Sequence, residues 1–415
     1  MIKETITMQE KKLGLTATNS KVTAVLRSNI KKTGIRLYDG QHLGIAGAIG
    51  SYNDEELTKS AKQMLDVKMP YAAEPAADIK RSLDISGCDT TDEEFAEIAH
   101  KLLDAADKKY PKFMFNGKMY LSQKEDSLIN SRGVELVQKD KTMEFGLLIK
   151  HRDSKNLMDS FGSVETRGGL SFEEILEALT YTCETYDNKI DFTDKEEKIP
   201  VVIFGQHFEF GMKFITDLRG DVFASGASLF SGKIGEKLFD DKFSLMVHRN
   251  PKKGLNFFDG EGVVLPDDKF ALIENGVLKS PYTSKRMAKQ FNLPITGTAG
   301  MVYDSAPDAN PMCLAIERSD KTIKELLGGR KAIFAVMAAG GDFTPQGEYA
   351  SPIQVAYMYD GENLLGRLPQ LSMSSNIFDM FGKDFIGAST DGSYKGCAYN
   401  YLAAEMNVRK IGDWT

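Results

Sequence analysis

The side chains that could bind a metal or act as nucleophiles are scattered through this chain rather than grouped. Its five histidines are separated by dozens of residues, so no HxxxH or HExxH pair places two imidazoles on one helical turn. Its four cysteines lie equally far apart and form no CxxC pair. These residues are His42, His100, His151, His207, His248, Cys88, Cys183, Cys313 and Cys397. We therefore expect no metal and no cofactor, with a zinc site built from distant ligands as the alternative.

Nucleophilic and acid–base sites have no better support. The chain contains no GxSxG elbow and no P-loop, and its glycine clusters lack the order of a dinucleotide-binding turn. Glu209 lies close to His207, but the phenylalanines on both sides of it favour a strand-to-helix entry. Asp259, Glu261 and Asp342 stand in glycine-rich turns, where carboxylates commonly accept hydrogen bonds from nearby backbone groups. We interpret these three as turn residues first.

Length, composition and charge limit the class of protein. A chain of 415 residues with 42% hydrophobic and 27% charged residues is long enough for two or three cores. Its net charge of -7 argues against a nucleic-acid partner. The longest apolar runs, such as 332–339, are shorter than the roughly 20 residues that span a bilayer. The first residues contain no secretory signal, so we expect a cytoplasmic protein without a membrane partner.

Local patterns predict the elements of the first half. Strand-like runs at 22–28, 34–40 and 42–50 predict an antiparallel meander with turns at 31–34 and 39–40. A helix is expected from 54 to 65 with Asn53 as its N-cap. The Asn116-Gly117 pair between two apolar runs predicts a second hairpin turn. Capping boxes at 91–94 and 171–174 predict helices over 92–108 and 172–188.

The second half is expected to be rich in strands. A charged linker at 191–198 precedes it, and Asp-Gly and Asn-Gly pairs punctuate it at the density typical of antiparallel sheets. One helix is predicted near 206–220 and another near 322–327. The fold class is therefore α+β. We expect an N-terminal α+β domain at 1–83, a middle α+β region at 84–198 and a mainly β domain at 199–415.

An ordered set of motifs runs through this second half. Residues 228–238 read SLFSGKIGEKL, 257–263 read FFDGEGV and 271–279 read ALIENGVLK. The sequences TGTAG at 296–300 and GGDFT at 340–344 follow. In this order the motifs resemble the TldD/PmbA family, bacterial and archaeal proteins once called modulators of DNA gyrase and now associated with metallopeptidases. With NSRGVEL at 130–136, the resemblance covers about residues 22–388.

The resemblance implies that a zinc motif is missing. Catalytic family members carry HExxxH on a helix ahead of a Leu-Glu-Gly-Asp block. Here 218–221 reads LRGD. Counting back without a gap puts Gly211 and Thr216 at the positions of the two histidines and Met212 at the position of the glutamate. None of these can bind zinc or take a proton from a bound water. Cys397 lies near the position of the family's third ligand. The pattern is similar to the PmbA (TldE) branch, which lacks the motif.

The resemblance therefore implies a non-catalytic subunit in peptide proteolysis or maturation. It would form a homodimer, or a heterodimer with a HExxxH-bearing TldD-type subunit, and help to enclose an unfolded peptide held by strand addition to exposed sheet edges. Two alternatives stay open: an independent hydrolase that uses Glu209, Asp259 or Cys397, and a homodimeric peptide-binding protein.

We also expect the glycine-rich turns of the motifs to border one concave face, onto which the helix at 206–220 packs so that Met212 and Thr216 lie where the metal ligands would have been. The candidate cleft or peptide-facing residues are Leu218, Gly220, Asp221, Ser228, Phe230, Asp259, Glu261, Gly262, Asn275, Gly276, Thr296, Gly297, Gly341 and Asp342.

Overall fold

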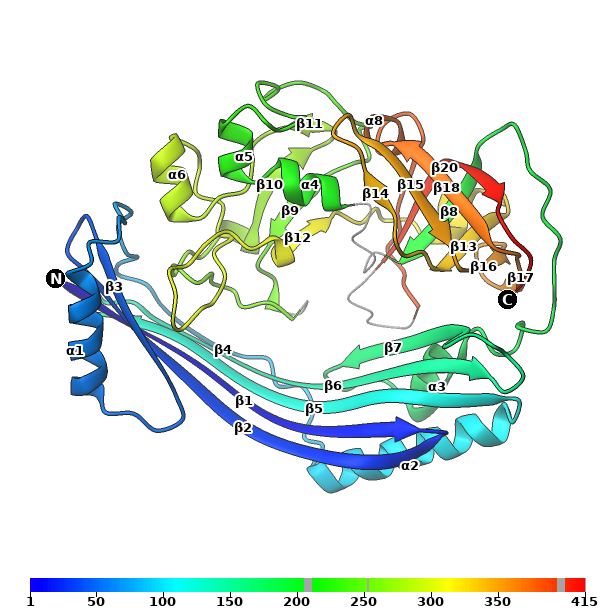
Figure 1. Ribbon diagram of the computed structural model, residues 1–415, viewed down its shortest axis with the longest axis horizontal. Helices are drawn as coiled ribbons and strands as arrows, with labels where there is room; N and C mark the ends of the chain where they lie inside the picture. The colour runs from blue at the N-terminus through cyan, green and yellow to red at the C-terminus, as the bar shows by residue number, and fades with distance from the viewer. Residues whose placement is uncertain (205–210, 252–253, 394–399, 415) are drawn as a thin grey trace.

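The computed structural model of the protein describes residues 1–204, 211–251, 254–393 and 400–414. Figure 1 shows a long curved sheet, built by the first part of the chain, and a second β-rich unit above its concave face. Most strand pairs are antiparallel, and a few helices lie at the edges and on the outer face. The predicted α+β class is confirmed.

The N-terminal sheet has seven strands in the order β3-β2-β1-β5-β6-β4, with β7 also paired to β6. All pairs are antiparallel except β4 with β6. The strands are β1 (Ile2–Thr18), β2 (Lys21–Tyr38), β3 (Leu43–Ile49), β4 (Lys80–Asp84), β5 (Phe113–Asn130), β6 (Glu135–His151) and β7 (Ser160–Thr166). Strands from both sides of residue 83 share this sheet, and the division into three domains stays a prediction.

Two of the predicted turns are wrong, because residues 31–34 lie inside β2 and Asn116-Gly117 lies inside β5. Glycine serves close packing at both places. A Cβ on Gly34 would lie 2.1 Å from the carbonyl oxygen of Tyr303, and one on Gly117 would lie 2.1 Å from that of Gly146. The turn between β1 and β2 is instead at 19–20, where both residues have positive φ.

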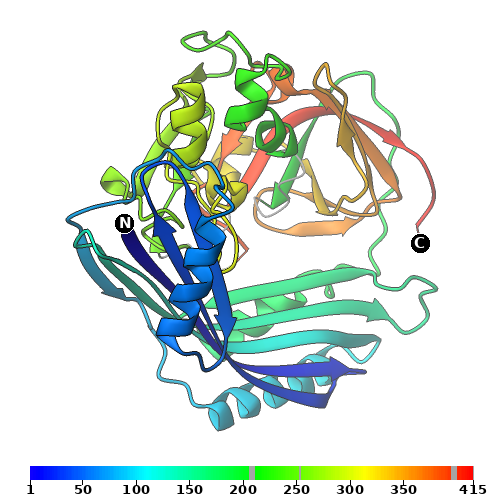
Figure 2. The same ribbon diagram turned by 60° about the vertical axis from the view of Figure 1, so that its left-hand side comes forward.

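The capping signals were more reliable than the turn signals. The Asn53 side chain accepts hydrogen bonds from two backbone N–H groups at the start of α1 (Asp54–Leu65). Both capping boxes form, at the start of α2 (Asp92–Lys109) and of α3 (Phe172–Thr180). Helix α3 ends at Thr180 rather than 188. Helices α2 and α3 cover the outer face of the N-terminal sheet with a shared apolar core, as Figure 2 shows.

The C-terminal unit contains a nine-stranded and a four-stranded sheet. The larger has the order β14-β15-β18-β20-β8-β13-β16-β17, with β19 paired to β20, and the smaller has the order β11-β10-β9-β12. Only β8 and β13 are parallel among the described pairs of these sheets. The strands are β8 (Ile199–Phe204), β9 (Leu245–His248), β10 (Lys269–Glu274), β11 (Val277–Leu278), β12 (Leu314–Ile316), β13 (Ala332–Met337), β14 (Asp342–Phe343), β15 (Glu348–Ile353), β16 (Val355–Tyr359), β17 (Leu364–Arg367), β18 (Leu371–Asn376), β19 (Phe385–Ala388) and β20 (Tyr401–Lys410).

Short helices complete the C-terminal unit. They are α4 (Met212–Asp217), α5 (Gly220–Ala224), α6 (Lys285–Phe291), α7 (Ile323–Leu327) and α8 (Ile377–Met380). Helix α7 confirms the prediction near 322–327 and begins with a capping box at Thr322. Helix α6 was not anticipated, although Ser284 caps it by accepting a bond from the Met287 N–H group.

A buried ion pair joins the two layers. Arg36 on β2 and Glu4 on β1 are 0% and 1% exposed, and Nη1 lies 3.2 Å from Oε1. The same guanidinium donates to the carbonyl oxygens of Gly260, at 2.6 Å, and Val302, at 2.8 Å. Tyr38 donates its hydroxyl to Glu4 at 2.9 Å. The buried charge of the sheet is therefore satisfied partly by loops of the C-terminal unit.

Replacing Arg36 should destabilise the protein strongly. In Arg36→Met the carboxylate of Glu4 stays buried without its cation, and two loop carbonyls lose their donor, which we expect to cost about 3 to 5 kcal/mol. Arg27→Met is the control, because Arg27 forms an exposed pair with Asp92 that should contribute less than about 1 kcal/mol. Urea unfolding measures both. Equal losses for the two variants would contradict the role given to Arg36.

Candidate functional site

Helix α4 and its N-cap residue carry the three residues predicted to occupy the positions of the zinc motif. Gly211 is its buried N-cap residue, while Met212, which is 47% exposed, and Thr216 face solvent. Phe214 and Leu218 are fully buried on the opposite side. In the described part of the predicted helix, Met212 and Thr216 therefore lie on the side away from the buried residues Phe214 and Leu218. The earlier candidates His207, Glu209 and Cys397 lie outside the described residues.

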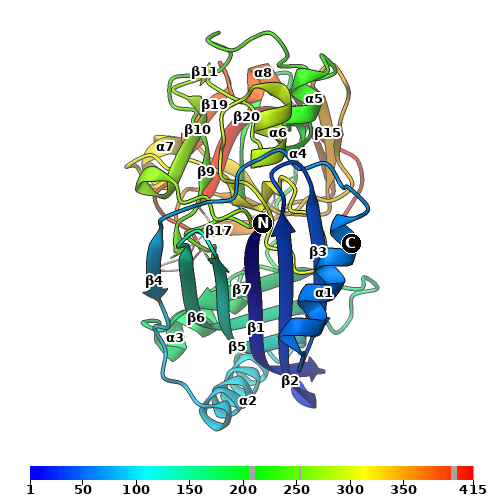
Figure 3. The ribbon, with the colours of Figure 1, turned by 90° about the vertical axis from the view of Figure 1, so that its left-hand side faces the viewer.

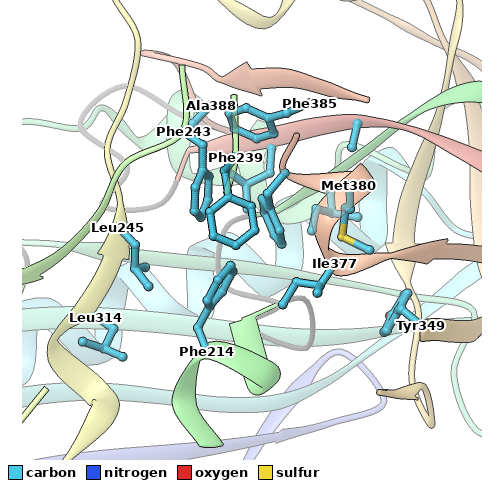
Figure 4. Packing of buried hydrophobic residues seen from close by; sticks show 14 of the residues in the cluster. Phe214, Phe239, Phe243, Leu245, Leu314, Tyr349, Ile377, Met380, Phe385 and Ala388 are labelled. Atoms are coloured by element: carbon cyan, nitrogen blue, oxygen red, sulfur yellow. The ribbon is translucent and has the colours of Figure 1, made fainter. Parts of the chain in front are cut away.

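An aromatic cluster fixes the orientation of α4. Figure 4 shows Phe214 pointing from the helix toward Phe239 and Phe243, with ring centroids 5.6 and 5.5 Å away. Phe230 stacks on Phe214 at 5.7 Å. The Phe230 N–H group donates to the Ser228 hydroxyl at 2.9 Å. The Ser-x-Phe motif thus supports the helix from below by packing.

Polar contacts fix the end of the same helix. Asp217 accepts a hydrogen bond from the Leu229 N–H group at 2.7 Å and pairs with Lys213 at 3.1 Å. In the adjoining LRGD block, Arg219 donates to Asp221 at 2.9 Å. These contacts are internal to the C-terminal unit, so the block acts here as a structural connection between α4 and α5.

A short segment, 282–285, which leads into α6, connects α4 to two of the motif turns. The Tyr282 hydroxyl donates to the Ile215 carbonyl oxygen at 2.7 Å, and its N–H group donates to that of Leu218 at 2.8 Å. The Gly220 N–H group donates to the Tyr282 carbonyl oxygen at 3.0 Å. A Cβ on Gly220 would lie 2.8 Å from the Thr283 side chain, so this approach needs glycine.

The next residues of the segment reach the turns themselves. The Thr283 N–H group donates to the Thr296 hydroxyl at 2.6 Å, and that hydroxyl donates to the Thr283 carbonyl oxygen at 3.0 Å. The Lys285 N–H group donates to Glu261 at 2.6 Å. The segment 282–285 therefore links α4 to the FFDGEGV and TGTAG motifs.

Asp259 holds these two motifs together. Its Oδ1 accepts from the N–H groups of Glu261 and Val263, both at 2.8 Å, and its Oδ2 accepts from that of Ala299 at 3.0 Å. The side chain is fully buried. Gly262 and Gly297, on either side, both have positive φ. The interpretation of Asp259 as a turn residue is consistent with these three backbone bonds.

Glu261 is a buried acid at the junction of the layers. It is hydrogen-bonded to the Tyr71 hydroxyl as well as to the Lys285 N–H group. Burial, and then the charge of Asp259, raise the pKa of Glu261 to about 7. Tyr71 comes from the loop between α1 and β4, so a residue of the N-terminal region completes the environment of a C-terminal motif.

A polar cavity of about 260 Å³ lies between the layers, near the same turns. We call it the interlayer cavity. Burial raises the pKa of Asp126 in its wall, and Asn256 donates to this carboxylate at 2.8 Å. Arg249 is buried and donates to the Gly297 carbonyl oxygen at 2.7 Å. The lining residues are Lys124, Asp126, Gln138, Asp140, Arg249, Gly254, Leu255, Asn256, Ala299, Gly300, Met301, Asn310, Met312 and Cys313.

The remaining candidates lie away from this junction. Asn275 and Gly276 have positive φ and form the predicted hairpin turn between β10 and β11. A Cβ on Gly276 would lie 2.2 Å from the Phe239 carbonyl oxygen, so the turn packs against the aromatic cluster. Asp342 begins the edge strand β14, and a Cβ on Gly341, the residue before it, would meet Ser351. Whether all the turns border one peptide-facing surface stays a prediction.

Sequence reasoning missed several residues of the junction. Arg36, Tyr71, Lys124 and Asp126 come from the first half of the chain and meet the motifs only in the folded protein. Tyr282 adjoins the ALIENGVLK motif, but only its hydrogen bonds with α4 reveal its role. No local pattern could have identified the first four, because their partners are more than a hundred residues away.

Metal ligands and membrane helices can be assessed over the described ranges alone. Within them, no three His, Cys, Asp or Glu side chains are grouped so that they could hold a metal. The expectation of no metal stays a prediction, since His207 and Cys397 are outside those ranges. No helix in the described part of the chain is long and apolar enough to cross a membrane.

Comparison with known proteins gives a match over half of the chain. The sequence model described as the PmbA/TldA metallopeptidase C-terminal domain matches residues 196–409. A curated relative, an uncharacterized protein of Methanocaldococcus jannaschii, is 27% identical over 156 residues, which are 37% of this chain. That alignment spans only 36% of the relative's own length.

Solved structures share the fold over nearly the whole chain. TldE from Thermococcus kodakarensis is similar over 98% of this chain and 96% of its own, with a TM-score of 0.78 and 16% identity. A candidate modulator of DNA gyrase from Thermotoga maritima is similar over 98% and 96%, with a TM-score of 0.77 and 18% identity. At these identities the likeness concerns the fold.

Glu261 should make stability depend on pH. Because its pKa is higher in the folded chain than the ordinary value near 4.5, its contribution to stability is complete below about pH 4.5 and is lost as the pH rises through about 7. Glu261→Gln cannot ionise. Its free energy of unfolding, relative to the unaltered chain, should therefore rise by on the order of 2 to 3 kcal/mol between pH 5 and pH 8.

The control for this experiment is Glu94→Gln, which should show the opposite sign. The Thr91 N–H group lowers the pKa of Glu94, so the loss of stability should be greatest at neutral pH and fade in acid. Urea unfolding at several pH values measures both variants. If the difference in free energy of unfolding between Glu261→Gln and the unaltered chain stays constant from pH 5 to pH 8, the raised pKa of Glu261 is refuted.

Proposed function

Because this chain belongs to the TldD/PmbA family of metallopeptidase-related proteins, we propose that it is a non-catalytic subunit of a peptidase complex. A HExxxH-bearing TldD-type partner would supply the zinc and cut an unfolded peptide, which both subunits help to enclose. The proposal rests on the predicted placement of Gly211, Met212 and Thr216 at the motif positions, and it is supported by the packing of α4 into the core through Phe214 and Leu218.

The contacts of α4 support a role that does not need a metal. Phe214 packs in the aromatic cluster, and Tyr282 donates two hydrogen bonds to the helix backbone. Neither the packing of Phe214 nor the hydrogen bonds of Tyr282 involve an imidazole or a general-base carboxylate. A subunit with this frame can shape the wall of a shared chamber while its partner performs the hydrolysis.

The concave face of the N-terminal sheet supports the enclosure of a peptide. Side chains that alternate along β1 and β5 make it polar: Lys12 pairs with Glu10 at 3.1 Å, and its ammonium lies 4.9 Å from the Tyr120 ring centroid. Lys124 and Asp126 continue this face into the interlayer cavity. The opposite face is covered by α2 and α3. A polar inner wall suits a hydrated peptide held through its backbone.

The two alternatives have less support. Among the described residues, the Asp259 side chain accepts hydrogen bonds from backbone N–H groups of its own turn and of the TGTAG segment, which favours a structural role over a reactive one. A homodimeric peptide-binding protein would retain the same frame but would not require a catalytic partner. The mixing experiment described below distinguishes it from the proposed subunit.

The purified chain should contain no stoichiometric transition metal. Gly211, Met212 and Thr216 offer no ligand, so we expect less than about 0.1 zinc per chain after preparation without chelators. Elemental analysis by mass spectrometry measures this content. About one zinc per chain, lost on replacing His207 or Cys397, would mean that the chain builds its own metal site.

Mixing with a catalytic homologue should reveal the activity of the complex. The chain alone should leave an unfolded peptide intact, and adding it to a HExxxH-bearing homologue from the same organism should be necessary for chelator-sensitive cleavage. The control replaces the glutamate of the homologue's HExxxH with glutamine, which should abolish cleavage in the mixture. Chelator-resistant cleavage by this chain alone, after contaminating proteases are excluded, would reject the proposal. Peptide binding without any need for the homologue would favour the homodimeric alternative.

A further inference from the structure

Part of β2 has no neighbouring strand on its outer side. Strand β1 pairs with β2 along its whole length, whereas β3 pairs with it only from Lys32 to Tyr38. The Lys31 carbonyl oxygen accepts the last bond on that side, from the Gly50 N–H group at 2.8 Å. Residues 21–31, which we call the open edge, are all exposed except Val22 and Ser28. An unpaired edge of this length is a ready template for another strand.

The backbone of the open edge presents a regular set of hydrogen-bonding groups. Successive residues of a strand direct their N–H and C=O groups to opposite sides. Since the backbone carbonyl group of Lys31 is directed outward, the backbone N–H and C=O groups of Asn29, Arg27 and Val25 are directed outward too. In the described part of the chain, no backbone group is bonded to these three on that side. They can therefore form a ladder with an added strand without disturbing the pairing of β1 and β2.

The side chains of the open edge combine apolar and basic character. Val25, Leu26 and Ile30 are 57%, 70% and 44% exposed, which is costly for a strand that stays in water. The edge contains Lys21, Arg27 and Lys31 and no acidic residue. Arg27 pairs with Asp92 on α2, but no acidic partner is found for the two lysines among the described residues. The edge therefore favours an acidic strand.

Pairing between two copies of this edge is disfavoured by its charges. In an antiparallel pair with two-fold symmetry about Arg27, that residue would lie opposite itself, and the lysines of both copies would add to the same basic surface. No acidic side chain in the segment could offset this. The edge also lies at the far end of the sheet from the C-terminal unit in Figures 1 and 3.

We propose that the open edge is the docking surface for the partner subunit, which adds a strand carrying acidic side chains opposite Lys21 and Lys31. This inference rests on the proposed function, and it specifies that the partner is a different chain rather than a second copy. Main-chain bonds would supply much of the affinity, and the lysines would select the partner. The exposed Val25, Leu26 and Ile30 would be covered in the complex.

The test uses the full chain and a HExxxH-bearing homologue from the same organism. Asn29→Pro removes one outward N–H group and leaves the β1 side of the strand bonded. Its matched control, Asn29→Ala, keeps that N–H group and loses the same side-chain contact with Gln9. We expect the Kd of the complex to rise at least about tenfold for Asn29→Pro and to stay within about twofold for Asn29→Ala.

Charge reversal provides a second pair of variants. Lys31→Glu should weaken the complex by about tenfold, whereas Lys59→Glu, an exposed lysine on α1, should not. Hydrogen exchange of the unaltered chain should slow in residues 21–31 when the homologue is added. That measurement needs no variant, so it tests whether residues 21–31 are the docking surface even if Asn29→Pro fails to fold.

Three results would overturn the proposal, each in a different way. A complex that forms with the unaltered chain but is insensitive to both variants, with no exchange protection in 21–31, rejects the open edge and leaves the proposed function intact. Absence of any complex rejects both. A dimer of this chain alone that Asn29→Pro dissolves would show that the edge binds a second copy, contrary to the charge argument.

Discussion

The burial of Arg36 is the constraint on which the relation of the two layers depends. A guanidinium taken out of water needs acceptors, and here they come from Glu4 in its own sheet and from the carbonyl oxygens of Gly260 and Val302 in the other layer. Gly34 permits the loop around Tyr303 to approach the sheet backbone closely enough for these bonds. Strand β2, which carries Arg36, is therefore hydrogen-bonded to the FFDGEGV turn and to the loop that follows the TGTAG motif.

From these turns the structural connection continues to α4. Gly260 lies between Asp259, which binds the Ala299 N–H group, and Glu261, which binds that of Lys285. The segment beginning at Tyr282 then bonds to the helix backbone. The FFDGEGV and TGTAG motifs thus have hydrogen-bonding roles, and Phe230 has a packing role, that a zinc ion does not supply. These contacts can form whether or not the predicted motif positions on α4 hold a metal.

Features determined by neighbours in sequence were predictable, and features determined by distant contacts were not. The capping boxes at Thr91 and Ser171 involve residues three positions apart, and both form. Gly34 and Gly117 were misread as turn residues, because glycine also serves close backbone approach and the approaching chain is remote in sequence. The turn character of Asp259 could be anticipated, but its bond to Ala299 and the contact of Gly260 with Arg36 could not.

The N-terminal sheet has three surfaces with different properties. One face is buried under α2 and α3, so it contributes stability alone. The concave face is polar and opens on the interlayer cavity. Among the described residues, the outer side of β2 between residues 21 and 31 has no neighbouring strand. Since hydrogen bonding at the edge acts within the plane of the sheet, a strand added there leaves the concave face uncovered. Assembly with a partner and contact with a peptide are therefore sterically compatible in this fold.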